Sequence, residues 1–284
     1  MKTIVAATDL SERSRVAIDR AAHIAAATGA RLVIVHAIDD SLPVAIRARR
    51  VTEAEEILRE LAATIDAPQV EMRVAVGDIF WALHRLATQA HAGLIVAGDH
   101  RRSSLRDIFR DTTVERLIRI SAVPVLIARV APAPAYRHAV IAVESEEASE
   151  LIATLSAFGT AVPARATLLH AFDAWAAGLM YVAGVERERI EEYRADTAFR
   201  AFENLRPLLS EPPFPLQIEV VDAAPDAAIA DFAKREGCDL VAASSHARRV
   251  VARGILGSVS SELIRHGRTD VLIVPRVVQR AGST

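Results

Sequence analysis

Short apolar runs rich in valine, isoleucine and leucine alternate along the chain with longer segments whose apolar residues recur at helical spacing. This alternation is typical of β-α-β units, in which a parallel sheet is covered by helices on both faces. In the first half, it predicts strands near residues 3–8, 31–37, 69–75, 93–98 and 123–129, and helices near 12–28, 44–64, 78–91 and 112–121. In the second half, it predicts strands near residues 138–143, 165–171, 216–221, 239–244 and 270–274.

The second half repeats the order of landmarks in the first half. Asp9 in the first copy matches Glu144 in the second. In the same way, His36-Ala37 matches His170-Ala171, and His100 matches His246. Two copies of about 140 residues each suit two domains better than one large one. We expect these domains at residues 1–132 and 136–284, joined near Ala131-Pro-Ala-Pro134. Ser11 and the Thr112/Glu115 pair have the positions of helix N-terminal caps.

Composition and charge exclude several classes of partner. The formal net charge of −2 gives no electrostatic reason to expect nucleic acid or an anionic membrane. No apolar run reaches the roughly 18 residues that span a bilayer, and the chain starts with a strand rather than a signal peptide, so we expect a cytoplasmic protein. Cys238 is the only cysteine, and we expect it to pack as a small buried side chain.

Two common phosphate-binding motifs do not occur. The chain has no Gly-x4-Gly-Lys-Ser/Thr, and no Gly-x-Gly-x-x-Gly follows the first strand of either copy. Ligands of open parallel sheets bind beyond the carboxyl ends of the strands where strand order reverses, which points to strands one and four. Near that place Gly257-Ser258 opens a helix, whose unpaired first N–H groups favour a phosphate.

Taken together, the acid after strand one, the His-Ala after strand two, the loop after strand four and the Gly-Ser helix resemble tandem universal stress proteins. The resemblance covers nearly the whole chain, twice. It implies an α/β fold of two tandem doubly wound domains, each a five-stranded parallel sheet flanked by helices, of the adenine nucleotide α-hydrolase-like, Rossmann-like type. Nucleotide-binding members of that family carry Gly-x-x-Gly-x9-Gly-Ser/Thr, which cradles ATP phosphates and ribose.

By this resemblance, the second copy binds ATP or ADP, with or without Mg²⁺. Its motif positions are Ser244, Ala247, Gly257 and Ser258, so the spacing is kept while both leading glycines are replaced. Residues larger than glycine fit less well where a chain needs a positive φ or touches a phosphate. The other positions that the resemblance assigns to this site are Ala142, Val143, Glu144, Ala171, His246 and Val259.

The first copy is expected to bind nucleotide weakly or not at all. Its motif positions are Gly98, Arg101, Asp111 and Thr112, and Asp111 places negative charge beside a negative ligand. The nearby Arg101, Arg102, Arg106 and Arg110 could offset that charge, although a solvated basic face is the preferred interpretation. The remaining positions that correspond to the site are Thr8, Asp9 and Ala37.

The histidines do not form a recognisable metal or catalytic set. No cysteine cluster or His-x3-His spacing accompanies them, and nothing resembles a Ser/His/Asp arrangement with a nucleophile elbow. We expect His36 and His170 to be hydrogen-bonded at strand ends.

One segment, from Asp173 to Pro207, is longer than its counterpart in the first copy. Its alternating charges predict an extended helix that covers the sheet, with a mobile lid over the second site as the alternative. Its apolar stripe, assigned to the core, comprises Tyr181, Ile190, Tyr193, Phe199 and Phe202. The last strands, 123–129 and 270–276, are predicted edges. By resemblance, they pair the two domains as an intramolecular pseudo-dimer, and a homodimer or an unknown protein partner stays open.

Three functions remain. The preferred one is a stress-response regulatory protein that binds ATP or ADP in its second domain and hydrolyses it slowly if at all. The second is a nucleotide-independent scaffold with both sites degenerate. The third is a slow ATPase or nucleotide-processing enzyme, for which no general base is evident.

Overall fold

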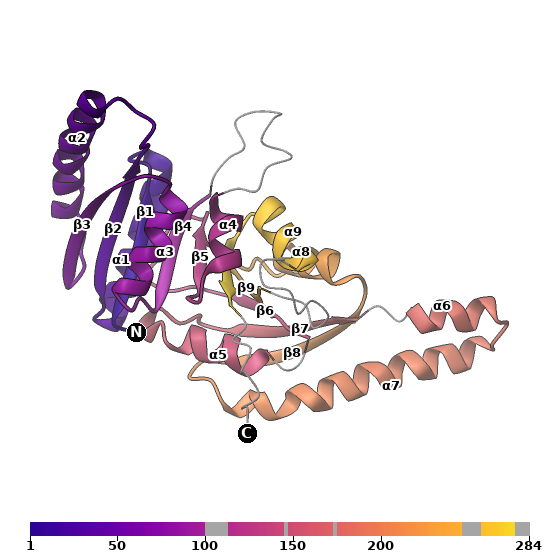
Figure 1. The fold of residues 1–284 in the computed structure, drawn as a ribbon. Coiled ribbons are helices and arrows are strands. Elements are labelled where there is room, and N and C mark those ends of the chain that lie inside the picture. Colours follow the sequence, from indigo (N-terminus) through magenta and orange to yellow (C-terminus); the bar gives the residue numbers. More distant parts are fainter. Residues whose placement is uncertain (100–112, 145–146, 173–174, 246–256, 276–284) are drawn as a thin grey trace, which may run out of the picture.

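The computed structural model describes residues 1–99, 113–144, 147–172, 175–245 and 257–275 (Figure 1). The first domain comprises β1 (Thr3–Thr8), α1 (Glu12–Thr28), β2 (Arg31–Ile38), α2 (Val44–Ala63), β3 (Gln69–Val76), α3 (Ile79–Gln89), β4 (Leu94–Gly98), α4 (Thr113–Ile120) and β5 (Val125–Ala128). The second comprises β6 (Ala139–Ala142), α5 (Ala148–Ser156), η2 (Gly159–Ala161), β7 (Ala166–Phe172), α6 (Trp175–Val182), α7 (Arg187–Leu205), η3 (Arg206–Ser210), β8 (Leu216–Asp222), α8 (Pro225–Arg235), β9 (Leu240–Ser244), α9 (Ser258–His266) and β10 (Asp270–Val274). All the predicted strands and helices occur, with bounds close to those expected.

All ten strands belong to one sheet in the order β3-β2-β1-β4-β5-β10-β9-β6-β7-β8. Within each domain the strands pair in parallel, as predicted. The two last strands, β5 and β10, pair antiparallel, with Leu126 opposite Leu272. The predicted pairing of the two domains is therefore confirmed, and the two five-stranded sheets continue into each other.

The apolar core continues across the domain boundary on both faces of the sheet. On one face the buried residues come from α1, α5 and the C-terminal end of α7, and they include Leu126 and Leu272 from the joining strands. On the other face, α3, α4, α8 and α9 cover Ile127 and Ile273. Because burial of apolar area is the main favourable term in folding, each domain stabilises the other.

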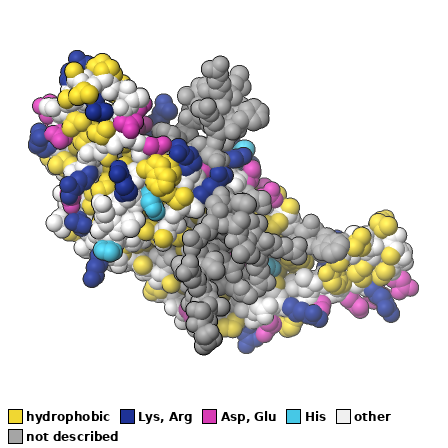
Figure 2. Space-filling view, viewed as in Figure 1, with side chains coloured by type: hydrophobic (Ala, Val, Ile, Leu, Met, Phe, Trp, Pro, Cys, Tyr) yellow, Lys and Arg dark blue, Asp and Glu magenta, His cyan; other side chains and the backbone are white. Residues whose placement is uncertain are grey.

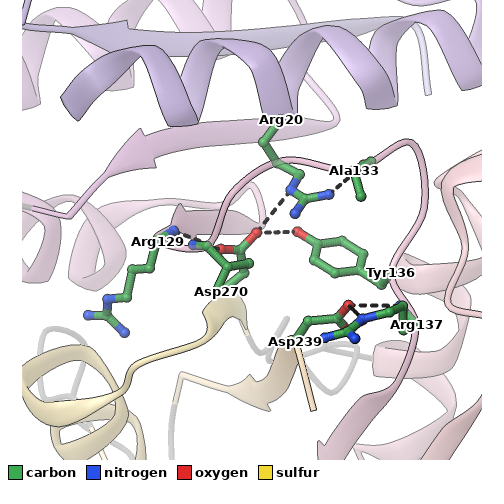
Figure 3. A network of polar contacts seen from close by, with 8 residues as sticks. Arg20, Arg129, Ala133, Tyr136, Arg137, Asp239 and Asp270 are labelled. Atoms are coloured by element: carbon green, nitrogen blue, oxygen red, sulfur yellow. Dashed lines mark hydrogen bonds and ion pairs between the residues drawn. The ribbon is translucent and has the colours of Figure 1, made fainter. Parts of the chain in front are cut away.

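A buried carboxylate joins the domains at the start of β10 (Figure 3). Asp270 is 0% exposed, and its Oδ1 accepts hydrogen bonds from the backbone N–H groups of Arg129 and Val130 at 2.7 and 2.9 Å. Its Oδ2 accepts from Nε of Arg20 at 3.0 Å and from the hydroxyl of Tyr136 at 2.8 Å. One side chain of domain 2 therefore holds α1 and the connection between the domains in place.

Arg20 and Tyr136 contact each other as well as Asp270. The guanidinium carbon of Arg20 lies 4.2 Å from the centre of the Tyr136 ring, and its Nη1 donates to the carbonyl of Ala133 at 2.8 Å. Burial, with Asp270 next to it, raises the pKa of the Tyr136 phenol well above its usual range, so the hydroxyl remains a neutral donor. Every charge in this cluster is paired, which is the condition for burying charges without a large penalty.

The long segment of domain 2 forms a two-helix arm. Ile190 is 7% exposed and packs with Tyr193 and Phe172, the last residue of β7. The assignment of the whole apolar stripe to the core is wrong for Tyr181 and Phe199, which are 78% and 64% exposed, and Phe202 is half-buried. For Tyr181 the reason is geometric, because α6 extends beyond the sheet (Figure 1).

We predict that Asp270→Ala lowers the free energy of unfolding by about 3–5 kcal/mol, because the variant leaves the Arg20 charge buried without its partner. The matched control is Glu191→Ala, which removes the exposed Arg187–Glu191 pair on α7 and should change stability by less than about 1 kcal/mol. Urea unfolding followed by circular dichroism measures both. Equal stability of the two variants would contradict the role given to Asp270.

A second prediction concerns Gly159, where η2 approaches the end of α1. A Cβ at Gly159 would lie 2.3 Å from the carbonyl oxygen of Ala27, whereas one at Gly184 would meet nothing within 4 Å. Both glycines have positive φ, +62° and +73°, so alanine costs about 1–2 kcal/mol of backbone strain at each. Gly159→Ala should lower the free energy of unfolding by about 1–3 kcal/mol more than Gly184→Ala. The reason is that only the new methyl group at residue 159 forces η2 and α1, and with them the two domains, to move apart. Thermal unfolding of the two variants gives this difference.

Candidate functional site

Strand order reverses once in each domain, between β1 and β4 and between β6 and β9. The crossover helix α1 packs on one face of the sheet, whereas α3 packs on the other. In domain 2, α8 packs on the face opposite α5. Ligands of open α/β sheets bind outside the carboxyl ends of such strand pairs.

In domain 2, most of the expected site residues that the structure describes lie at this edge. Ala142 ends β6, with Val143 and the exposed Glu144 directly after it. Ala171 lies near the end of β7, and Ser244 ends β9. These residues come from three neighbouring strands, so the parallel sheet brings them to one edge.

The N-terminus of α9 is fixed against the end of β9. The N–H of Gly257 donates to the carbonyl of Ser245 at 3.1 Å, and the Ser260 hydroxyl donates to the carbonyl of Ser244 at 2.6 Å. Gly257 is the N-cap residue and provides no side-chain cap, in contrast to Ser11 on α1 and Asp78 on α3. The first N–H groups of α9, including that of Val259, lack intrahelical partners and carry partial positive charge.

In each domain, a histidine ring is hydrogen-bonded to a backbone carbonyl at the carboxyl end of the first strand, β1 or β6. His170 Nδ1 is 3.0 Å from the carbonyl oxygen of Val143, and His36 Nδ1 is 3.0 Å from that of Thr8. Since a carbonyl only accepts, Nδ1 carries the proton in each ring, and Nε2 of the neutral form is left as an acceptor. The prediction that both histidines are hydrogen-bonded at strand ends is confirmed.

The loop after β1 in domain 1 is stabilised by hydrogen bonds among its own residues and to the start of α1. The hydroxyls of Thr8 and Ser14 are 2.8 Å apart, and both are buried. Oδ1 of Asp9 accepts from the N–H and the hydroxyl of Ser11, at 3.0 and 2.5 Å. Ser11 in turn caps α1, as predicted, and Leu10 between them has a φ of 64°. These contacts hold the Asp9 carboxylate on its own turn.

Three further acids, not predicted as site residues from the sequence, lie at the carboxyl edge of domain 1. Asp39 and Asp40 follow β2, and Asp99 follows Gly98 at the end of β4. The backbone N–H of Ser41 lowers the pKa of Asp39, which therefore stays ionised near neutral pH. Ser245 takes the place of Asp99 in domain 2. The position of these acids directly after predicted strands was the signal that could have identified them.

Arg129 connects the edge of domain 1 to α9 of domain 2. Its Nη1 donates to the carbonyl of Leu263 at 2.9 Å, its Nη2 to that of Ile264, and its Nε lies 3.3 Å from Oδ1 of Asp99. A cation at a helix C-terminus is favourable because the last carbonyls carry partial negative charge. In addition, Arg265 of α9 pairs with the buried Glu115 of α4 at 2.8 Å.

Several expected site residues lie outside the described residues. These are Arg101, Arg102, Arg106, Arg110, Asp111, Thr112, His246 and Ala247, and nothing is described of the Ser258 side chain. Within the described ranges, no group of three or more histidine, cysteine or acidic side chains could hold a metal ion. Cys238 is 6% exposed, and burial raises its pKa to about 11, which confirms its predicted packing role.

The sequence profile of the Universal stress protein family matches residues 1–129 and again residues 135–275. The chain belongs to the universal stress protein family. It therefore comprises two tandem domains of this family, as the repeat predicted. Over the part of the chain that the structure describes, no helix combines the length and apolar character needed to cross a membrane.

Individual relatives agree with this assignment. Universal stress protein A homolog 1 of Coxiella burnetii is 34% identical over 110 residues, which cover 35% of this chain and 76% of that protein. A universal stress protein from Archaeoglobus fulgidus has the same fold along the chain, with a TM-score of 0.69, 17% identity, and coverage of 97% of this chain and 98% of that one. A protein of unknown function from Pseudomonas aeruginosa PAO1 gives a TM-score of 0.67 at 17% identity, with coverage of 97% and 92%.

Proposed function

We propose that this tandem universal stress protein binds one adenine nucleotide, ATP or ADP, in the domain expected at residues 136–284. Binding regulates the protein in a stress response, with little or no hydrolysis. The observation that carries the proposal is the N-terminus of α9, which Gly257 leaves without a side-chain cap and which contacts the end of β9 at the strand-order reversal. A phosphate group there accepts hydrogen bonds that the helix cannot supply internally.

Other residues of domain 2 fit the remaining parts of a nucleotide. Glu144 is exposed directly beyond β6 and can accept a hydrogen bond from the adenine or ribose. Val143 and Ala171 lie beside it at the ends of neighbouring strands. Ser244 and Gly257 keep the motif spacing of nucleotide-binding relatives, although Ser244 and Ala247 replace glycines.

Domain 1 is proposed to be a degenerate site with a structural role. Asp39 and Asp40 add two carboxylates at its carboxyl edge, beside the Asp9 that corresponds to Glu144, and they repel a triphosphate at short range. This observation favours a scaffold role for domain 1. The competing function is a protein in which both domains act as a scaffold and neither binds nucleotide. Slow hydrolysis in domain 2 is the third function, and it needs a base positioned at an attacking water.

The proposal predicts that Gly257→Asp abolishes nucleotide binding, with a loss of at least about 100-fold in affinity, because a carboxylate would occupy the phosphate position. The helix should not be destabilised, since Asp is a good N-cap residue and Gly257 has an ordinary φ of −62°. Gly257→Asn has the same shape without the charge, and it should lose less affinity.

Titration calorimetry with ATP and Mg²⁺ measures these affinities and the stoichiometry. The wild type should bind one nucleotide per chain, and adenine nucleotide should be released when freshly purified protein is denatured. Binding of two nucleotides would refute the degenerate first site. An unchanged affinity in Gly257→Asp would refute the site in domain 2, and no binding at all would favour the scaffold.

The paired histidines give an independent test of which domain binds. His170→Ala removes the ring that positions the Val143 carbonyl, and we expect nucleotide affinity to fall by up to about 10-fold, since the variant loses one positioning hydrogen bond within the protein. His36→Ala removes the equivalent contact in domain 1 and should leave the affinity unchanged. The same calorimetric titration compares them, and a larger effect of His36→Ala would assign the nucleotide to domain 1 instead.

A further inference from the structure

The two ends of the ten-stranded sheet carry very different surfaces. The α6–α7 arm extends beyond the β8 end, and α2 lies at the β3 end (Figure 1). Nine strand spacings separate β3 from β8, which corresponds to about 40 Å at the usual spacing of strands. The arm and α2 of one chain therefore cannot meet.

The arm exposes an unusual amount of apolar surface. Leu179, Tyr181 and Val182 on α6 are 56%, 78% and 84% exposed, and Phe199 on α7 is 64% exposed. Figure 2 shows hydrophobic side chains gathered at the end of the arm. Exposed apolar residues are common singly, but the three that lie within four positions on α6 form a group on a projecting element, which is typical of an interaction surface.

Next to this apolar surface, a groove between α6 and α7 is acidic. Its lining carries Glu186, Glu188, Glu192 and Asp196, against the single cation Arg189. Asp196 pairs with Arg200, whereas none of the described cations forms an ion pair with Glu186, Glu188 or Glu192. The groove therefore has negative charge available for a basic partner.

The N-terminal part of α2 has the complementary character. Residues 44–52 contain Arg47, Arg49 and Arg50 and no acid, and Val44 and Ile46 are 72% and 42% exposed. The N-cap residue of this helix is Pro43, which provides no side-chain cap. Cations near a helix N-terminus are unfavourable because the first N–H groups already carry positive charge. An acidic partner with an apolar patch would offset this cost and cover both exposed side chains.

We propose that the partner is a second copy of this chain: α2 of one copy binds the α6–α7 groove of the other, and the reverse contact forms at the same time. Arg47 and Arg50 face Glu188 and Glu192 of the other copy, and the apolar residues of α2 meet the exposed residues of α6. A two-fold axis exchanges the two ends of the sheet, so this contact occurs twice and closes a dimer. The edges of β5 and β10 take no part because they already pair with each other.

Charge reversal on each surface tests the dimer. Glu188→Arg with Glu192→Arg makes the groove basic, and Arg47→Glu with Arg50→Glu makes α2 acidic. Each double variant alone places like charges opposite each other in both contacts, and we expect its dimer dissociation constant to rise about tenfold or more. A mixture of the two double variants restores opposite charges in both contacts, so a mixed dimer should form with wild-type affinity.

Sedimentation velocity and light scattering measure the oligomeric state in low and high salt, and circular dichroism checks that each variant is folded. The matched control for the groove variant, Asp66→Arg with Glu211→Arg, raises the net charge by the same amount at exposed residues outside both surfaces and should leave the dimer intact. The apolar contact is tested by Tyr181→Ser with Val182→Ser, which should weaken the dimer without reducing nucleotide binding.

The proposal is overturned if the wild type stays monomeric at high concentration, or if the dimer survives both reversals. Failure of the mixed variants to form a dimer while each is folded also overturns it. Open-ended oligomers that grow with concentration would overturn the two-fold arrangement. Each of these results is independent of nucleotide binding in domain 2.

Discussion

The antiparallel contact between β5 and β10, with the buried Asp270 beside it, determines the form of the whole protein. The contact turns two five-stranded sheets into one, and it lets both apolar layers run through the domain boundary. Asp270 accepts four hydrogen bonds, two from the backbone between the domains and two from Arg20 and Tyr136. With its acceptor capacity filled, the carboxylate can be fully buried and can fix how the domains are oriented.

This joint makes the two domains unequal although their folds are alike. Asp270 has Pro124 at the corresponding position of the other joining strand, so only one half of the interface carries the carboxylate. Arg129 crosses the joint to bind the last carbonyls of α9 and also contacts Asp99, next to the carboxyl edge of domain 1. Arg129 of domain 1 thus holds the C-terminal end of α9, the helix that is proposed to bind phosphate. Domain 1 itself carries several acidic residues at its own carboxyl edge.

Most of the fold could be predicted from the sequence. Strands such as β1 and β2 are apolar on both faces, and Ser11 and Gly29 mark the ends of α1, which are local signals within one element. The repeat added the tandem arrangement. The sequence also placed Glu144 and Ser244 at the carboxyl ends of strands, and parallel strands bring those ends to one edge of the sheet.

The sequence by itself thus determined the elements, their order and the family, because these follow from local periodicity and from motifs that repeat at fixed spacing. Tertiary structure alone decided which side chains meet. Asp270 and Arg20 are 250 positions apart, and their pairing depends on the antiparallel joint between the domains. Tyr181 belongs to a segment whose apolar residues predict a core stripe, yet it is 78% exposed because α6 extends past the sheet. Apolar periodicity shows that a helix has one face, but only the position of its neighbours shows whether that face is covered.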